Sequence, residues 1–553
     1  MQVSIPSNSV HSEEALALRP AAELMRLPRL GAAFPTRLSF MRSLLRRLGE
    51  DQVQVKRRLW DMDDLGYGHA VYSLTLGGYD YSLVAISLPL ADEDRSDRVI
   101  AEAWDAAFTL YDGIPTAKEV ERLTKILPKQ EACRFTAREL TLGRANKSVR
   151  FFTEVVEALA KGQQPETARI EQIGYLMRTT AVYGNGKFGI ADRDVYAARP
   201  GLKAPFQVEM LTVWLVRAFT HDLVEFVAKR RNPDIAVPLD PKIKRHLGIG
   251  NATGLGMAPF LVSHPTLLHA WVLARETALA RVLAAPKLDE AQKAALRDLT
   301  AQVKRYLAAW NVQDSQQMHR IQVLRDEFDA LGTDITHFSD LWSAAQDTSL
   351  ECQELVQALL IDLNPSLVDD LAQSLTCNKA PAWHPQETVG ELKADVERSY
   401  AWAMAYDFDQ QAQTELFWYT SEEKLEPRLG HRYEEPGADR ERPLDIARQI
   451  QQLYAALSAA DPDQALAFFY VDHPRLRAIA ARVQTCRDLP YTEIHGNLIA
   501  DTYRPIDMLR FKLAMFGAGK FDPKSDLWTR ITLFQGAPLI NEDLSADWGF
   551  AAL

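Results

Sequence analysis

The sequence predicts a predominantly helical α+β protein, with a small antiparallel β-meander in an N-terminal domain and a large all-α domain after it. Residues 55–90 alternate in polarity and are rich in Val, Tyr, Leu and Ile, as half-buried strands are. From about residue 208 onward, apolar residues recur every three or four positions, which is typical of amphipathic helices. The segment TRITLF, 529–534, predicts one late strand, which either joins the N-terminal sheet or pairs with itself across a dimer.

The meander has a clear turn signal. The segments VKRRLWDMD, HAVYSLTL and YDYSLVAISL predict three strands, and Gly77 and Gly78 separate the last two. Two consecutive glycines supply the positive φ angles that a tight hairpin needs. Because an isolated meander is only marginally stable, we expect the following helices to cover one of its faces.

Helices are predicted on both sides of residue 192. In the first part we expect them over about 97–111, from Thr116 with a capping box at Glu119, over about 147–161 and over about 166–183. In the second part, helical spacing covers about 208–230, 266–284, 289–310, 314–330, 337–361, 388–406, 444–459 and 474–485. This pattern divides the chain into a basic N-terminal arm (1–54), an α+β domain (55–192) and a helical domain with irregular loops and a C-terminal strand (207–553).

Composition and charge limit the classes of function. The 553 residues carry a formal net charge of −11, whereas nucleic-acid binding depends on Lys and Arg that neutralise phosphates, so we expect no nucleic-acid partner. The same charge opposes a winged-helix interpretation of residues 115–189. No apolar run reaches the roughly 20 residues of a membrane helix, and residues 1–20 lack the pattern of a signal peptide, so we expect no membrane partner.

The cysteines and the basic arm suggest where and how the protein works. The 4 cysteines are dispersed, with no CxxC pair, which predicts reduced thiols in a cytoplasmic protein. An arginine-rich arm on an acidic chain is expected to dock either onto its own body or onto a partner subunit. We therefore also expect a homo-oligomer, formed through this arm.

No cofactor is predicted. The chain contains neither a GxGxxG fingerprint between a strand and a helix nor a Walker A motif. A metal site stays open as a hypothesis, because Glu209, His221, Asp222 and Glu225 lie along one predicted helix. The five-residue interval between His264 and His269 is not the spacing of a HExxH metal site.

The segment GIGNATGLGMAPFLVSHPTLLHAW, 248–271, is the densest in glycine, proline and histidine. We expect a helix to begin near Gly254, with Asn251 or Thr253 as its cap and an anion on the free backbone N–H groups of 250–256. Gly254 and Gly256 would let that anion approach closely. The alternative is a structural turn, in which the glycines allow a close approach of a neighbouring element.

Two sets of side chains complete the candidate site. Besides Asn251, Gly254 and Gly256, the substrate-binding set contains Asn185 and Lys187 of VYGNGKF, Lys520 of the similar MFGAGKF, and Arg428 in an aromatic-rich loop. We expect Lys187 and Lys520 to lie near one another or near one ligand. The predicted general acid–base residues are His264, Glu493 and His495, of which the last two lie on one side of the extended segment YTEIHGN.

The preferred functional hypothesis is a cytoplasmic enzyme that acts on a small anionic, carboxylate-bearing organic substrate by side-chain acid–base chemistry. It would be a lyase, an isomerase or a hydrolase, working without a nucleotide cofactor. The support is the density of Gly, His, Arg and aromatic residues in predicted loops, where sites commonly lie. The alternative is a non-catalytic helical interaction or scaffold protein.

Overall fold

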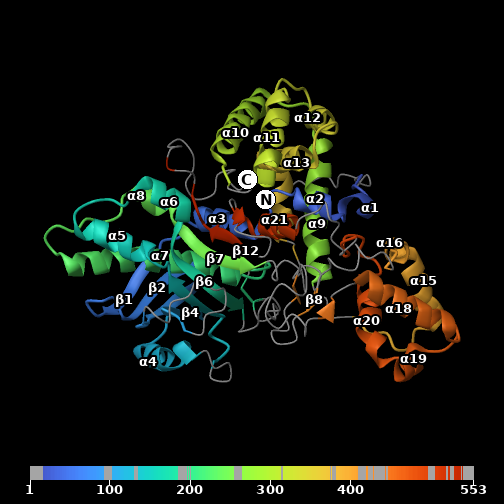
Figure 1. Cartoon of the computed structure of the whole chain (residues 1–553), viewed down its shortest axis with the longest axis horizontal. Coiled ribbons are helices and arrows are strands. Elements are labelled where there is room, and N and C mark those ends of the chain that lie inside the picture. Colours follow the sequence, from blue (N-terminus) through green and yellow to red (C-terminus); the bar gives the residue numbers. More distant parts are fainter. Residues whose placement is uncertain are drawn as a thin grey trace, which may run out of the picture.

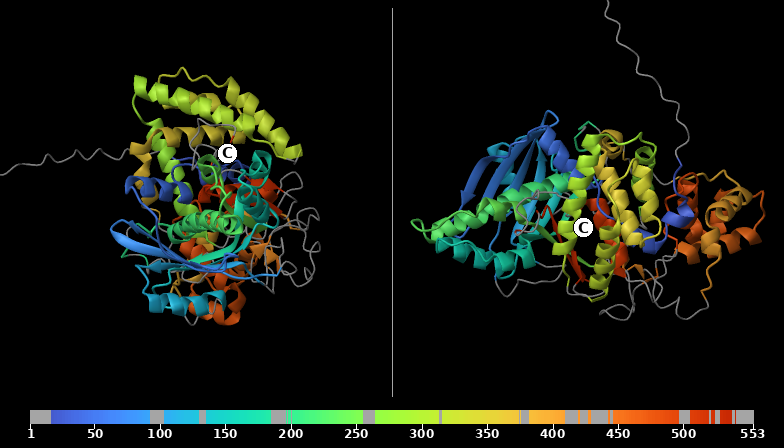
Figure 2. Two further views of the ribbon diagram at one scale, coloured as in Figure 1. Left: turned by 90° about the vertical axis from the view of Figure 1, so that its left-hand side faces the viewer. Right: turned by 90° about the horizontal axis from the view of Figure 1, so that it is seen from above.

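The computed structural model places a β-sheet at one end of the molecule, a small helical lobe at the other, and further helices between them (Figures 1 and 2). The residues that the structure describes are 17–91, 103–129, 135–184, 196, 198–199, 201–254, 264–312, 315–373, 375, 382–408, 419–420, 427–428, 442–443, 446–495, 505–518, 521–523, 528–536 and 539. Among these residues, no helix is long and apolar enough to span a membrane.

The sheet has nine strands in the order β1-β2-β3-β4-β5-β6-β7-β12-β11. The first six, each antiparallel to the next, are β1 (Lys56–Met62), β2 (Gly68–Leu76), β3 (Tyr79–Ser87), β4 (Ala106–Asp112), β5 (Thr141–Lys147) and β6 (Tyr175–Gly184). β7 (Gly248–Gly254) pairs parallel with β6, and β12 (Trp528–Leu533) and β11 (Phe521–Pro523) follow in antiparallel pairing. The predicted meander is confirmed, but it belongs to a longer, mixed sheet, and the late strand joins that sheet.

The predicted hairpin turn and the predicted capping box in the first part of the chain are both confirmed. Gly77 and Gly78 have φ angles of 58° and 80°, and they connect β2 to β3 in a tight hairpin. Thr116 and Glu119 form a capping box at the start of α4 (Ala117–Ile126).

β4 occupies part of the segment predicted as a helix over about 97–111, so that prediction is wrong. Both faces of β4 are buried, with Ala106, Phe108 and Leu110 in the main core and Ala107 and Tyr111 in a second core. A strand that is buried on both faces is apolar at nearly every position. Its apolar residues therefore also match helical spacing, and periodicity does not distinguish the two.

The prediction of a helix over about 166–183 is also wrong for the second half of that range. The helix α6 (Thr167–Ile173) ends at Gly174, whose φ of 72° lies in the left-handed region, and the strand β6 begins directly afterwards. Leu176 and Met177 are consecutive and both are fully buried in the main core. That continuous apolar run again conceals the strand period.

Helices cover both faces of the sheet. The long helix α7 (Gln207–Arg231) packs across the central strands and against α5 (Phe151–Ala160), and it forms one face of the main core. On the opposite face, α4 covers a smaller core that includes Val71, Val84 and Leu123. Figure 1 shows α7 and α4 on the two sides of the strands.

Helices make up most of the chain after α7. The short helix α8 (Pro241–His246) lies at the sheet end, near α6 (Figure 1). The middle group contains α9 (Pro265–Leu283), α10 (Glu290–Ala309), α11 (Ser315–Ala330), α12 (Phe338–Ala345), α13 (Leu350–Leu363), α14 (Pro365–Gln373) and α21 (Pro505–Phe516). The lobe contains α15 (Val389–Ser399), α16 (Ala401–Met404), α18 (Ile446–Ala459), α19 (Leu466–Asp472), the 3-10 helix η7 (Pro474–Leu476) and α20 (Arg477–Cys486). The predicted helices are confirmed, except that 337–361 and 388–406 are each divided into two.

The N-terminal segment packs against the chain's own helices. Its elements are α1 (Ala21–Leu24), α2 (Leu27–Gly31) and α3 (Phe40–Glu50). Arg19 forms ion pairs with Glu276 of α9 at 2.7 Å and with Glu354 of α13 at 3.2 Å. Glu354 also pairs with Arg29 at 3.0 Å and with Arg275 at 3.3 Å. A single buried carboxylate thus joins the N-terminal segment to two helices of the middle group.

We expect Glu354→Gln to lower the free energy of unfolding by about 3–5 kcal/mol, because it leaves the buried Arg275 without its carboxylate partner. Chemical denaturation of both proteins measures the difference. Burial opposes the charge on Glu354, but Arg19, Arg275 and Arg29 outweigh it and hold its pKa below the ordinary value. The stability that this group contributes is therefore present above the pKa of the unfolded chain, and it is lost as the pH falls through the lower folded pKa.

The matched control is Glu290→Gln, in the exposed first turn of α10, which forms a surface ion pair with the neighbouring Lys293. Such a surface pair contributes roughly 0–1 kcal/mol. Equal losses of stability in the two variants would contradict the anchoring role of Glu354.

Candidate functional site

Residues 248–254 form the strand β7, so the predicted helix start near Gly254 is wrong. The anion site on the backbone of 250–256 loses this helical basis and stays a prediction. The ladder pairs Asn251 with Ile531 and Gly254 with Trp528, and on its other edge β7 pairs with β6. Neighbouring strands therefore pair with β7 along its β12 edge from Ile249 to Gly254 and along its β6 edge as far as Asn251. Gly256 lies outside the described residues, and α9 begins at Pro265.

The glycines of β7 fit the alternative, a close approach of neighbouring elements. A Cβ atom on Gly248 would lie 2.2 Å from the backbone oxygen of Leu533. A Cβ atom on Gly250 would lie 2.6 Å from the ring of Tyr175. β7 therefore fits between its two neighbours only because it lacks side chains at these positions.

The other predicted substrate-binding residues are not brought together by the described structure. Asn251 is half-buried on β7, where it has a polar partner. Arg428 belongs to a short strand, β9 (Pro427–Arg428), which pairs with β8 (Tyr419–Thr420). Asn185, Lys187 and Lys520 lie outside the described residues, and so does the expected proximity of the two lysines.

Glu493 lies in a buried polar network beside the lobe. The Arg482 guanidinium donates two hydrogen bonds to its carboxylate, at 2.6 Å and 2.8 Å, and the Tyr400 hydroxyl donates a third at 2.9 Å. Burial and the neighbouring Glu493 charge raise the pKa of Tyr400 well above its ordinary value, so this hydroxyl remains a donor. The carboxylate is thereby held in one orientation.

His495 lies next to this network and connects the lobe to the N-terminal segment. Its backbone N–H donates to the carbonyl of Met25 at 2.7 Å, and its ring stacks on Trp402 with centroids 5.0 Å apart. Burial and Arg26 lower its pKa to about 4, although the Glu493 charge acts in the opposite direction. The imidazole is therefore neutral at pH 7.

Two histidines near the start of α9 have different surroundings. His264, the third predicted acid–base residue, is half-buried and directly precedes α9. His269, which was not part of the predicted site, accepts a hydrogen bond from the backbone N–H of Tyr491 at 3.2 Å, and the two rings stack. His269 thus has a packing role between α9 and the segment that carries Glu493.

The four residues considered for a metal site form separate interactions. Asp222 accepts hydrogen bonds from Tyr72 and Arg57, whereas Glu225 pairs with Lys244 at 2.6 Å. Burial and two nearby cations lower the pKa of His221 well below its ordinary value. Within the described ranges, no three His, Cys, Asp or Glu side chains are grouped so that they could hold a metal ion.

Cys352 and Cys486 are buried free thiols, and Cys133 and Cys377 lie outside the described residues. Burial raises the pKa of Cys352 to about 11 and, with the Glu493 charge, that of Cys486 to about 12. Both groups are therefore protonated and poor nucleophiles at neutral pH.

A groove in the sheet end, which we call the α5 groove, has the chemistry expected of a binding site. Its volume is about 570 Å³, within the range of about 300–1,000 Å³ typical of ligand pockets. Its lining comes from the β1–β2 turn, the turn between β5 and α5, α5 itself and the end of α7: Leu65, Tyr67, Lys147, Ser148, Val149, Arg150, Phe152, Thr153, Glu154, Val156, Glu157, Val227 and Arg231.

The α5 groove combines basic side chains with aromatic rings. The Lys147 ammonium lies 5.1 Å from the ring centroid of Tyr67 and 5.2 Å from that of Phe152. Arg150 and Arg231 add two exposed guanidinium groups to the lining. Of the two carboxylates in the lining, Glu154 is bound by Arg169 at 3.1 Å.

Arg150 has a rare backbone conformation, with φ 71° and ψ −49°. The N–H of Phe151 donates to the carbonyl of Val149 at 3.0 Å, so these residues form a γ-turn of the classic, strained type. Such strain persists only where the surroundings enforce it, and it is frequent at binding sites.

The sequence interpretation missed the α5 groove. It placed Lys147 at the start of a helix, whereas the helix begins at Phe151 after the strained turn. The available signal was a pair of basic residues, Lys147 and Arg150, between a strand and an apolar helix. Nothing in the sequence indicates that Tyr67 and Arg231 meet them.

No family model matches this chain, and neither a curated protein nor a solved structure matches it.

We expect the pKa of His495 to be about 4 in the folded protein, measured from its ring resonances by NMR. Because this value lies below that of an unfolded histidine, about 6.5, the unfolded chain binds more protons between the two values. The contribution of His495 to stability is present above about pH 6.5 and is lost as the pH falls toward 4. In His495→Gln this part of the pH dependence should disappear, and an unchanged stability profile would contradict the assignment.

We expect Gly248→Ala to lower the free energy of unfolding by about 1–3 kcal/mol or more, because the new methyl group overlaps the Leu533 backbone, which cannot move without breaking the ladder. Thermal and denaturant unfolding measure this change. The control is Gly49→Ala in α3, where a Cβ atom meets nothing within 4 Å. There, alanine should stabilise the helix by roughly 0.5–1 kcal/mol.

Proposed function

We propose that the protein binds a small organic anion, a carboxylate with an apolar or aromatic part, in the α5 groove. The observation that carries this proposal is the placement of Lys147 over two aromatic rings, in a groove that also contains Arg150 and Arg231. The cations would attract the carboxylate, and Arg150 offers the planar fork that binds one with two hydrogen bonds.

The remaining lining favours a ligand that is not purely ionic. Leu65 and Val149 are 65% and 38% exposed and line the groove, whereas the apolar lining residues Val156 and Val227 are buried beneath it. A ligand ring or short chain would cover the two exposed groups while its carboxylate lies between the cations. A simple inorganic anion would leave them exposed to water.

We expect Lys147→Met to weaken the binding of benzoate or 3-phenylpropionate by about tenfold or more, because a charge-assisted interaction contributes about 1.5–3 kcal/mol. Isothermal titration calorimetry measures the affinity. Lys118→Met, on the exposed surface of α4, is the matched control and should bind as the wild type does. Absence of binding by the wild-type protein to any aromatic or aliphatic carboxylate would reject the proposal.

We expect Arg150→Gly to separate binding from stability. Glycine accepts the conformation of this γ-turn without strain, so the variant should be more stable by about 1–3 kcal/mol, less the entropy cost of the glycine. It also loses the guanidinium and should bind the carboxylate more weakly. Greater stability with unchanged affinity would remove Arg150 from the binding site, although Lys147 could still be tested alone.

Acid–base catalysis by Glu493, His495 and His264 is a second candidate function, as a lyase, isomerase or hydrolase. It is favoured by the proximity of Glu493 to a neutral His495. This pair contacts Arg482 and Trp402 of the lobe. The lobe and α5 lie at opposite ends of the molecule (Figures 1 and 2), so the pair would form a separate site. Loss of turnover of a carboxylate substrate in His495→Gln, with its binding retained, would support this function.

The free buried thiols Cys352 and Cys486 support a cytoplasmic location as part of the same proposal. The net charge of −11 continues to oppose a nucleic-acid partner.

A further inference from the structure

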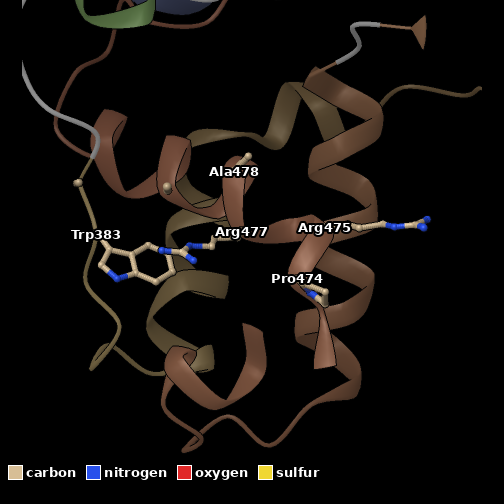
Figure 3. Close-up of a pocket in the computed structure, with 7 residues that line it drawn as sticks. Trp383, Pro474, Arg475, Arg477 and Ala478 are labelled. Carbon is tan, nitrogen blue, oxygen red and sulfur yellow. The ribbon is translucent and has the colours of Figure 1, made fainter. Parts of the chain in front are cut away.

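The helical lobe has a cavity of about 480 Å³ on its surface, which we call the lobe cavity. It lies where the segment before α15 meets η7 and the start of α20, and its lining is Ala382, Trp383, Pro474, Arg475, Arg477, Ala478 and Ala481. Figure 3 shows the Arg477 guanidinium over the Trp383 indole, whose ring centroid lies 4.1 Å from the guanidinium carbon. The Tyr470 ring also stacks with this indole, at 5.0 Å.

An apolar pair protrudes from α19, the helix that directly precedes the cavity-lining segment η7. Phe468 and Val471 are 67% and 76% exposed, and as residues i and i+3 of α19 they lie side by side on its surface. The chain continues from Val471 directly to Pro474, which lines the cavity. Exposed apolar groups of this size, on a lobe that also has a cavity lined by a tryptophan, mark an interaction surface.

We infer that this face of the lobe binds a second copy of the same chain, with Phe468 of each protomer inserted into the lobe cavity of the other. The face presents both halves of a contact, a protruding aromatic residue and a cavity large enough for a phenyl ring. A surface that carries both halves is self-complementary, which is what a two-fold symmetric interface requires.

The charges on this face of the lobe would also be complementary between two copies of the chain. Asp472 is exposed directly beside Val471, and two exposed arginines line the cavity: Arg477, which lies over Trp383, and Arg475, whose side chain points away from that indole at the edge of the cavity (Figure 3). When the apolar pair of one protomer enters the cavity of its partner, each Asp472 approaches the partner's arginines. Two opposite-charge contacts then form, one on each side of the two-fold axis.

The lobe end offers a modest interface. Stable interfaces bury about 1,200–2,000 Å² in total, and one aromatic anchor per protomer with its rim lies near the lower limit. We therefore expect a dimer with a dissociation constant in the micromolar range, which sedimentation velocity from about 1 µM to about 200 µM would detect.

The test uses the full chain. Wild-type protein should sediment as a mixture of monomer and dimer whose proportions change with concentration. Phe468→Asp should make it monomeric throughout this range, and Ala478→Trp, which fills the cavity, should do the same. Ile235→Asp, at a 55% exposed apolar residue in the loop after α7, is the control and should dimerise normally.

A charge exchange tests the symmetric pairing itself. Asp472→Arg and Arg475→Asp should each weaken the dimer at least tenfold, and the double variant should restore it, because each exchanged residue again meets an opposite charge. All substituted residues are exposed, so melting temperatures should remain close to that of the wild type. Monomeric wild-type protein at about 200 µM, or a dimer that persists in Phe468→Asp, would overturn the inference. Either result leaves the carboxylate proposal untouched.

Discussion

The position of β7 between β6 and β12 is the constraint on which the rest of the structure depends. Through it, strands from residues 56–184 and strands from 521–533 form one sheet. The fit requires bare backbone at Gly248 and Gly250, since side chains there would overlap Leu533 and Tyr175. Because β12 is fixed in the sheet, the preceding α21 is held beside α2 and α3. The ladder on β7 thus brings the C-terminal part of the described chain beside the N-terminal helices.

Buried and half-buried ion pairs define the position of the N-terminal helices more closely than hydrophobic packing alone would. Arg42 and Asp362 form a buried pair at 2.7 Å, and Arg37 pairs with Asp369 of α14 at 2.7 Å. Burial raises the pKa of Asp362 even though Arg42 opposes this shift, so its ionised form is stabilised only while the arginine is in place. Buried pairs of this kind add little net stability, but a displaced helix would leave charges unpaired in the core. They select one docking position for a segment whose apolar residues would tolerate several.

The sequence predicts those elements whose signal is local. The Gly77–Gly78 hairpin, the Thr116–Glu119 capping box and the amphipathic helices were predicted because turn geometry, capping and one-sided burial act over a few residues. β4 and β6 were missed because both of their faces are buried, which removes the period of two. The 248–254 segment was predicted as a helix start because the reason for its glycines is not local. Gly248 and Gly250 are needed for close packing against Leu533 and Tyr175, which are distant in the sequence. The α5 groove was missed for the same reason, because Tyr67, Lys147 and Arg231 come together only in the folded chain. The strained backbone at Arg150 cannot be recognised from the residue types around it.

The α5 groove is lined by α5, and the lobe cavity by η7 and α20. Because α5 and α20 lie at opposite ends of the molecule (Figures 1 and 2), the two sites are far apart, and this separation has a thermodynamic consequence. A ligand changes an association equilibrium only if it binds the two association states with different affinity. None of the residues that line the groove belongs to the lobe, and a dimer formed through α19 and α20 would leave both grooves open at its outer ends. The two equilibria should therefore be independent unless the middle helices change their packing. In such an assembly the lobe would set the number of binding grooves, and Lys147, Arg150 and Arg231 of each groove would set the affinity.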